Sequence, residues 1–371
     1  MKVLITVPSY HPSIFGGIAI CMHQIIPEVA KKCQVAVLTT SFKIPDNSNI
    51  EYDKWMSKDG HEIMYVKTEH TLLSTKYIIT AINQVKRCDR VYLNSLFFFP
   101  NLLVYLFAKI YKKKVFWSTH GELGEPALKI KNFKKKIYLV VLKTISAKIH
   151  FIATSDQEAI QIRNKFKWNK VSVIPNFFEI IKLEDVPRKN QFLFLGRISP
   201  IKKIENLIIA FSKSLVLTDT KASDYKLIIA GEYDNEYVQY FEHLKALIQS
   251  LSMNDRISFI GSVSSPQKEV LIAESKALCL VSSSENFGNV VVEALAQGTP
   301  VIASYGTPWA DLNETKSGFW IENSPEKISE AINLLINMSR AEYIEICKNA
   351  ELLSKKYSKN NIVSLWDILF S

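Results

Sequence analysis

Residues 281–304, VSSSENFGNVVVEALAQGTPVIAS, hold the pattern that decides the fold. They continue an apolar run from Ala277 to Val281, whose length fits a buried parallel strand. A polar loop containing Gly288 leads into a helical pattern, and Gly298-Thr299-Pro300 ends it before a second strand over Val301–Ala303. Strand, glycine loop, helix and strand in this order predict a parallel α/β sheet.

Two glutamates eight positions apart mark this unit as a candidate binding site. Glu285 lies in the loop and Glu293 lies about one turn into the helix. The N–H groups at a helix N-terminus attract phosphate, and Gly288 allows a close backbone approach. Carboxylates beside such a site can accept paired hydrogen bonds from sugar hydroxyls. Taken alone, the same residues also fit a plain helix cap with Glu293 on a solvated face.

The segment from Glu285 to Ser304 resembles, almost residue for residue, the E-x7-E segment of family 4 glycosyltransferases of GT-B architecture. The resemblance implies that Glu285 lies by the transferred sugar and that Glu293 binds the ribose of the nucleotide. It also implies donor contacts from Val263 and from the residues that follow Glu285, which are Asn286, Phe287, Gly288, Asn289 and Val290.

A second signal is the loop Gly196-Arg197 with Lys202, which joins a strand to a helix. An arginine fork and a mobile lysine can clamp a diphosphate, although two such cations alone would more often be solvated. The resemblance places Arg197 and Lys202 on the donor phosphates. Lys203 stands where the family usually has glycine.

Two further positions follow strands of the first half. Gly16-Gly17 ends the loop after the first strand; no G-x-G-x-x-G is present, so a tight turn would also explain it. His120 follows the fourth strand, at the edge where open α/β sheets bind ligands. A lone histidine is more often structural, but the resemblance implies that His120 lies near the donor sugar and that Gly16-Gly17 approaches the diphosphate.

Strand and helix patterns alternate along the whole chain. The fold class is therefore α/β, and the resemblance implies GT-B: two Rossmann-like domains facing across a cleft, with the last helix crossing back. The charged segment Lys182–Gln191 reads as a linker. We predict an acceptor-side domain over 1–185 with the returning helix 357–371, and a nucleotide-sugar domain over 186–356.

Composition limits the possible classes of protein. The chain has 371 residues, 47% of them hydrophobic, and no apolar run reaches the length of a membrane span. The apolar start is too short for a signal peptide. The five cysteines are scattered without metal-ligand spacing, which predicts reduced thiols in a cytoplasmic protein without a structural metal.

The net charge of +10 is concentrated between Lys109 and Lys148, where eleven lysines accompany two acids. A charge run is often a solvated face, but cations with apolar neighbours also suit an anionic membrane surface. The residues concerned are Lys112, Lys113, Lys114, Lys129, Lys131, Lys134, Lys135 and Lys136, with Leu123, Leu128, Ile130, Phe133, Ile137, Tyr138 and Leu139. Stacking aromatics are not interleaved with these lysines, so a nucleic-acid partner is not expected.

The resemblance implies a glycosyltransferase that retains the anomeric configuration of the donor sugar. We expect it to need no metal, because no D-x-D follows a strand and Arg197 and Lys202 could neutralise the leaving diphosphate. Its catalytic residues would be Glu285, His120, Arg197 and Lys202. The donor would be a UDP- or GDP-sugar and the acceptor a lipid-linked glycan. Gly306-Thr307-Pro308-Trp309 resembles the members that build surface polysaccharides such as O-antigen and capsule. Two alternatives stay open: a nucleotide-sugar 2-epimerase of the same fold, and a non-catalytic binder of anionic lipid or nucleic acid.

Overall fold

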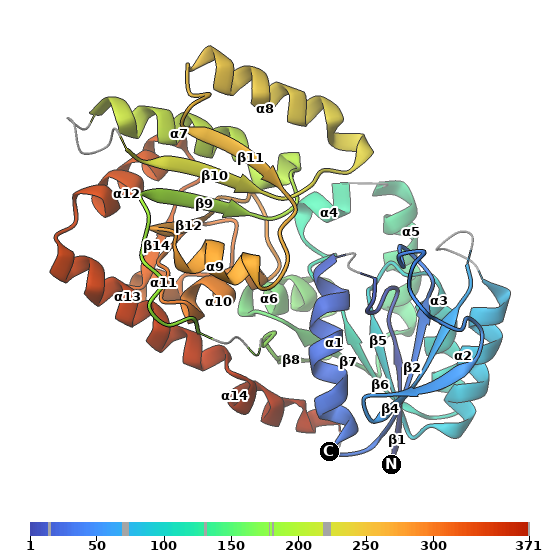
Figure 1. The fold of residues 1–371 in the computed structure, drawn as a ribbon. Coiled ribbons are helices and arrows are strands. Elements are labelled where there is room, and N and C mark those ends of the chain that lie inside the picture. Colours follow the sequence, from blue (N-terminus) through green and yellow to red (C-terminus); the bar gives the residue numbers. More distant parts are fainter. Residues whose placement is uncertain are drawn as a thin grey trace. The chain divides into compact units, whose positions relative to one another are not determined.

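The computed structural model describes residues 1–13, 16–68, 74–129, 132–177, 179, 182–217 and 224–369 (Figure 1). The chain divides into two compact units, one made of 1–178 with 359–371 and the other of 179–358. The predicted boundaries were 185/186 and 356/357.

The difference at the first boundary has a clear cause, because the segment predicted as a linker is bound to the second unit. The guanidinium of Arg188 donates to the carbonyl oxygens of Ser275 at 2.8 Å, Gln297 at 3.0 Å and Gly298 at 2.8 Å. The backbone N–H of Leu183 also donates to Gln297 Oε1 at 2.9 Å. These contacts make 182–190 part of the second unit.

The first unit is built on an eight-stranded sheet in the order β3-β4-β2-β1-β5-β6-β7-β8. Every neighbouring pair is parallel except β3 and β4, which are antiparallel. The strands are β1 (Lys2–Thr6), β2 (Gln34–Thr40), β3 (Trp55–Lys58), β4 (His61–Val66), β5 (Arg90–Asn94), β6 (Lys114–Ser118), β7 (Ile149–Ala153) and β8 (Lys170–Val173). The sequence did not predict β3 and β4, because their apolar runs, Trp55-Met56 and Ile63-Met64-Tyr65-Val66, are short.

The helices of the first unit pack on both faces of this sheet. They are α1 (Gly16–Ala30), α2 (Thr75–Arg87), α3 (Pro100–Ile110), α4 (Glu125–Lys129), α5 (Asn132–Ile145) and α6 (Asp156–Lys165). Alternation along β5 sends Val91 and Leu93 into a core shared with α2, α3, α5 and α6. Tyr92 points to the opposite face, where its ring centroid lies 5.5 Å from that of Trp366.

The second unit contains six parallel strands in the order β11-β10-β9-β12-β13-β14. They are β9 (Gln191–Leu195), β10 (Lys226–Ala230), β11 (Ile257–Gly261), β12 (Ala277–Leu280), β13 (Val301–Ser304) and β14 (Gly318–Ile321), of which the sequence missed only β14. The order reverses between β9 and β12. Open α/β sheets bind ligands at such a switch point, outside the carboxyl ends of the strands.

The helices of the second unit connect these strands. The α-helices are α7 (Ile204–Leu217), α8 (Val238–Ser250), α9 (Gln267–Ala273), α10 (Asn289–Ala296), α11 (Asp311–Glu314), α12 (Pro325–Asn337) and α13 (Arg340–Ser354). A short 3-10 turn, η1 (Pro200–Lys202), precedes α7.

The chain returns to the first unit at its end, as predicted, but not as one helix. It forms α14 (Lys359–Val363) and the 3-10 turn η4 (Ser364–Leu369). Lys359 Nζ lies 3.0 Å from Glu28 Oε1 on α1, and Trp366 is buried. Tyr357, predicted as the start of the returning helix, stays in the second unit, and Phe370 lies outside the described residues.

Two global features bear on the sequence predictions. All five cysteines are free thiols. Across the described residues, every helix is too short or too polar to span a bilayer.

Candidate functional site

Lys202 and Glu285 meet at the switch point of the second sheet. Lys202 ends η1 just after β9, and Glu285 lies in the loop after β12. Their Nζ and Oε2 atoms form an ion pair, and both side chains are mostly buried. Two predicted site residues that are 83 positions apart are therefore brought together at the edge where ligands bind such sheets.

The loop that carries Glu285 is fixed by backbone contacts on two sides. The N–H of Ser283 donates to the carbonyl of Ile201, and that of Glu285 donates to the carbonyl of Gly306, each at 2.8 Å. A Cβ at Gly306 would lie only 2.5 Å from the Ser282 oxygen, so only glycine allows this approach. Gly306 thus helps to hold the loop that carries Glu285, which the sequence did not predict.

Trp309 holds the next part of the loop. Its buried indole N–H donates to the carbonyl of Phe287 at 2.5 Å. The Phe287 ring is buried against Trp309 and Tyr357, with centroids 5.4 Å and 5.7 Å away. The Phe287 side chain therefore points inward and supports the loop, and the donor contact expected of Phe287 stays a prediction.

Gly288 turns this loop into helix α10. Its φ of 78° lies in the left-handed region, where residues with a Cβ are strained. A Cβ there would also lie 2.7 Å from Leu280 Cδ2. Beside it, Asn286, Asn289 and Val290 are half-buried on the loop and the first turn of α10, where the backbone N–H of Val291 donates to the carbonyl of Gly288 at 2.9 Å.

Glu293 lies on α10 and pairs with Lys268 of α9. Lys268 Nζ is 3.0 Å from Glu293 Oε1, and both side chains are mostly buried. Lys268 could not be predicted from the sequence, because a single lysine in a short helix belongs to no motif. Val263, another predicted donor contact, is half-buried in the loop after β11.

Arg197 takes a different partner from Lys202. Its side chain is exposed, and its guanidinium lies 3.2 Å from Asp234 in the loop after β10. The loops after β9 and β10 approach each other closely. A Cβ at Gly231 would lie only 1.9 Å from the Gly196 carbonyl oxygen, so this approach requires glycine. Lys203, in the place of the usual glycine, has a φ of 53° and so adopts the backbone conformation that glycine prefers.

In the first unit, His120 follows β6 and is bonded to Asn94 at the end of β5. Asn94 Nδ2 donates to the carbonyl of Thr6, which leaves its Oδ1 to accept from His120 Nε2–H at 2.8 Å. Part of His120 reaches the surface, but protein surrounds the ring, and this burial lowers the pKa of His120 to about 4. At neutral pH the ring is uncharged, so it can accept a hydroxyl hydrogen bond at Nδ1 but cannot neutralise phosphate.

Buried Glu158 shapes the His120 loop from α6. Its Oε1 accepts from Thr119 Oγ1 and from the backbone N–H of Gly121, each at 2.6 Å. Its Oε2 accepts from the N–H of Thr154 at 2.7 Å. These hydrogen bonds to Glu158 hold the turn at His120 and Gly121, where φ is 49° and 78°.

Gly16 and Gly17 form the first turn of α1, which begins two residues earlier than predicted. They follow β1, which is parallel to and beside β5, so they come after the same carboxyl edge of the sheet at which Asn94 lies. Residues 14 and 15, which precede them in the predicted loop, lie outside the described residues.

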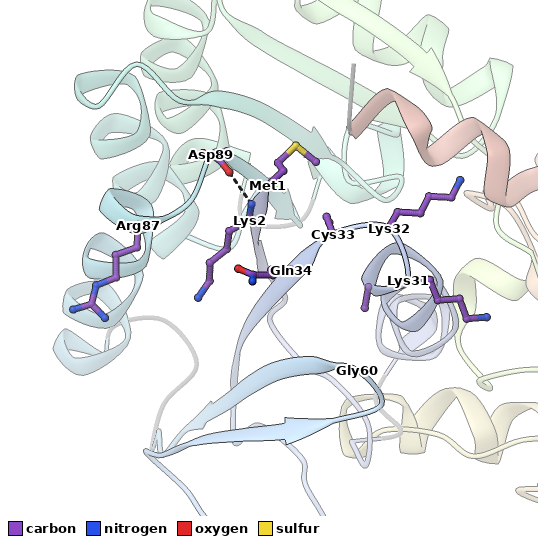
Figure 2. A pocket seen from close by; sticks show the side chains of 10 residues that line it. Met1, Lys2, Lys31, Lys32, Cys33, Gln34, Gly60, Arg87 and Asp89 are labelled. Carbon is purple, nitrogen blue, oxygen red and sulfur yellow. Dashed lines mark hydrogen bonds between the residues drawn. The ribbon is translucent and has the colours of Figure 1, made fainter.

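A hollow of about 670 Å³ lies at the opposite edge of the first sheet, at the amino ends of β1 and β2 (Figure 2). The N–H of Lys2 donates to Asp89 across it at 2.7 Å. Its other lysines already have carboxylate partners, Lys31 with Glu28 and Lys32 with Asp367. The hollow contains no predicted site residue, and we do not assign it to the candidate site.

A search of the described ranges for three or more His, Cys, Asp and Glu side chains placed to hold a metal ion finds no such group. Two mostly buried ion pairs of the second unit involve predicted site residues, Lys202 with Glu285 and Lys268 with Glu293.

The chain is similar to known proteins over both units. A family model described as glycosyl transferases group 1 matches residues 177–352. The alpha-1,3/1,6-mannosyltransferase ALG2 of Homo sapiens is 33% identical over 174 residues, 44% of this chain and 40% of the relative, so less than half of its length is spanned. The GDP-mannose:cellobiosyl-diphosphopolyprenol alpha-mannosyltransferase of Xanthomonas oryzae pv. oryzae is 26% identical over 347 residues, 89% of the chain and 85% of the relative.

Solved structures agree on the fold. Anabaena HepE in complex with UDP-glucose has a TM-score of 0.79 at 18% identity, covering 100% of this chain and 99% of that one. WaaG, a glycosyltransferase involved in lipopolysaccharide biosynthesis, has a TM-score of 0.69 at 15% identity and covers 99% of each chain. With two parallel α/β units and a returning C-terminal segment, the predicted GT-B fold is confirmed.

Proposed function

We propose that this chain belongs to the glycosyl transferases group 1 family, whose model matches residues 177–352, and that it is a retaining, metal-independent hexosyltransferase. It transfers the sugar from a nucleotide sugar to a glycan acceptor. The observation that carries the proposal is the Lys202–Glu285 pair at the switch point, beside the N-terminus of α10. A cation, a helix N-terminus and a carboxylate in one place suit a ligand that joins a diphosphate to a sugar.

Each member of the pair has its own role in this proposal. An ammonium group has three N–H donors, so Lys202 can hold Glu285 and still donate to phosphate oxygens. The lysine thereby offsets the repulsion between the Glu285 carboxylate and the diphosphate. Glu285 orients the sugar through its hydroxyls, and Glu293 binds the ribose.

The proposed transfer step uses only the donor, the acceptor and residues of this chain. The bond from the anomeric carbon to the diphosphate oxygen breaks, and the nucleoside diphosphate leaves with the electron pair. The acceptor oxygen bonds to that carbon on the same face, and its proton passes to the leaving phosphate oxygen. Lys202, Arg197 and the α10 N-terminus stabilise the charge on the leaving group, which is why a metal is not required.

The donor and acceptor follow from the relatives as proposals for this chain. HepE was solved with UDP-glucose, and the Xanthomonas relative is named for GDP-mannose and a diphosphopolyprenol acceptor. We infer a UDP- or GDP-hexose donor and a lipid-linked acceptor. The enzyme would act in the cytoplasm at the inner face of the plasma membrane, in the synthesis of a surface polysaccharide such as O-antigen or capsule.

The test is incubation with UDP-, GDP-, ADP- and TDP-sugars in the absence of acceptor. Slow release of sugar from one donor supports transfer, because water then replaces the acceptor. A change of configuration at the sugar C2 would favour the 2-epimerase. If no nucleotide binds, the chain would be a non-catalytic binder and the proposal fails.

A further inference from the structure

Helix α5 (Asn132–Ile145) exposes a continuous apolar stripe to solvent (Figure 1 shows α5 next to α4). Phe133 is 76% exposed, Ile137 51%, Val140 63% and Val141 44%. These residues are spaced at i, i+4, i+7 and i+8, so they share one face of the helix. Scattered exposed apolar residues are ordinary, whereas a row of four on one helix face indicates a binding surface.

The opposite face of α5 packs against the core of the first unit. Leu139 and Leu142 are buried in the core of the first unit, and Tyr138 and Ile145 pack against that core. Lys135 points the same way, because its Nζ lies 4.7 Å from the centre of the Phe97 ring. The exposed stripe is therefore not needed to hold α5 in place.

Lysines border the stripe on both sides. Lys134, Lys136 and Lys143 are exposed, and α5 contains no acidic residue. With 3.6 residues per turn, Lys134 lies at one edge of the stripe, and Lys136 and Lys143 lie at the other. Apolar residues with lysines along both margins are what an interfacial helix presents to a bilayer.

We propose that the exposed stripe of α5, Phe133, Ile137, Val140 and Val141 with Lys134, Lys136 and Lys143, binds an anionic lipid bilayer. The charge selects this partner: a second copy of the chain would bring like charges together, whereas acidic headgroups complement them. This proposed membrane surface contains fewer residues than the lysine-rich segment that the sequence predicted.

Several residues of the predicted membrane surface are not available to lipid. Leu123 and Leu139 are buried, and Leu128 and Tyr138 pack against the core. Lys135 is turned inward over Phe97. Ile130 and Lys131 lie outside the described residues.

The position of α5 connects lipid binding to the candidate acceptor side. Lys135 contacts Phe97, and the backbone N–H of Phe97 donates to Glu122 at 3.1 Å. Glu122 follows His120 by two residues, so the first turn of α5 is coupled to the His120 loop. Docked α5 would keep that loop near a lipid-linked acceptor, a consequence that rests on the proposed function.

The experiment is co-sedimentation of the full chain with vesicles of phosphatidylcholine alone or mixed with phosphatidylglycerol, at low and high salt. Lys134→Gln/Lys136→Gln is expected to weaken binding to acidic vesicles by about tenfold or more, since each lysine near an acidic surface adds about fivefold. Phe133→Ser/Ile137→Ser should weaken binding at both salt concentrations, because apolar insertion is not screened.

Matched controls remove the same groups elsewhere in the first unit. Lys67→Gln/Lys86→Gln deletes two exposed lysines, and Ile79→Ser/Ile160→Ser deletes two exposed apolar side chains. Both controls should bind like the wild type. Equal losses in controls and α5 variants, or equal binding to both vesicle types, would overturn the proposal, as would a wild-type dimer that the α5 variants convert to monomer.

Donor hydrolysis without acceptor separates this inference from the proposed function. The α5 variants should hydrolyse the donor like the wild type, with unchanged thermal midpoints. If the wild type has no activity on any donor while vesicle binding still depends on α5, the transferase proposal fails and the membrane surface stands. If hydrolysis is normal and vesicle binding ignores α5, the membrane surface fails alone.

Discussion

Lys202 and Glu285 are ion-paired across the point where the strand order of the second sheet reverses. Each comes from a loop at the carboxyl end of a central strand, one after β9 and the other after β12. Without ligand the two charges offset each other in a mostly buried position. A donor that brings both phosphate and sugar can engage both groups without leaving either charge uncompensated.

Replacing Lys202 by methionine should lower kcat/KM at least about 100-fold, close to 3 kcal/mol of transition-state stabilisation, because the leaving diphosphate loses a fixed cation. Lys213→Met is the control, since Lys213 pairs with Glu326 on the surface. Activity should persist in EDTA. Full activity of an Arg197→Ala/Lys202→Ala double variant, or abolition by EDTA, would contradict the proposed clamp.

Substitutions of Glu285 and Glu293 should have different effects on nucleotide binding. Glu293→Gln is expected to weaken the binding of free UDP or GDP by about tenfold, because a charge-assisted hydrogen bond to the ribose is lost. Glu285→Gln should leave that affinity within about twofold and reduce sugar turnover instead. Calorimetric titration with the nucleoside diphosphate measures the first effect. Equal affinity losses in both variants would refute the division of roles.

Lys268 should act through Glu293. Lys268→Met removes the cation 3.0 Å from Glu293 Oε1, so the Lys268→Met and Glu293→Gln effects on nucleotide affinity should couple by about 1 kcal/mol in a double-mutant cycle. The control cycle combines Lys268→Met with Glu285→Gln, whose effects should add. Additive effects in both cycles would leave Lys268 without a positioning role.

Gly288→Ala tests the backbone of the loop. The substitution combines a strained φ with an overlap against Leu280, and we expect a loss of about 2–4 kcal/mol in the free energy of unfolding. Gly261→Ala is matched, because its φ of 74° is similar but no atom lies within 4 Å of the added Cβ, and it should cost about 1 kcal/mol. Urea unfolding followed by tryptophan fluorescence measures both. Equal losses would show that the overlap relaxes.

His120 should make the first unit acid-sensitive. Its pKa is about 4 in the folded chain against 6.5 unfolded, so the unfolded state binds the extra proton as pH falls below about 6.5, and stability decreases. At pH 5 the His120 contribution to the loss is about 2 kcal/mol relative to pH 7. His120→Gln should lose correspondingly less between these two pH values, measured by urea unfolding.

Comparing His120→Gln with the wild type isolates the contribution of His120 to the pH dependence of stability from those of the other histidines. Burial lowers the pKa of His11, His23, His61 and His150 as well, so they contribute in the same direction in both proteins. Only the difference between variant and wild type belongs to His120. If the two proteins show the same pH dependence, protonation of the His120 ring in the folded state costs no stability, and the prediction is wrong.

The sequence by itself determined the fold class and most strands. Apolar β-branched runs such as Val301–Ala303 are local signals, and burial on both faces of a parallel sheet demands them. It also placed Glu285 and Lys202 at strand ends, because a motif in one loop is readable from neighbouring residues. Short edge strands such as β3 and β14 were not predicted, because the apolar run in each is only two or three residues long.

Only the tertiary structure decided which residues face each other. Strand order brings Lys202 to Glu285, turns Phe287 inward onto Trp309, and places Lys268 against Glu293. It also divides the three consecutive lysines of α5, sending Lys135 inward and leaving Lys134 and Lys136 in solvent. Periodicity describes the face of one element, whereas contacts between elements depend on how distant segments pack, and no local pattern records that.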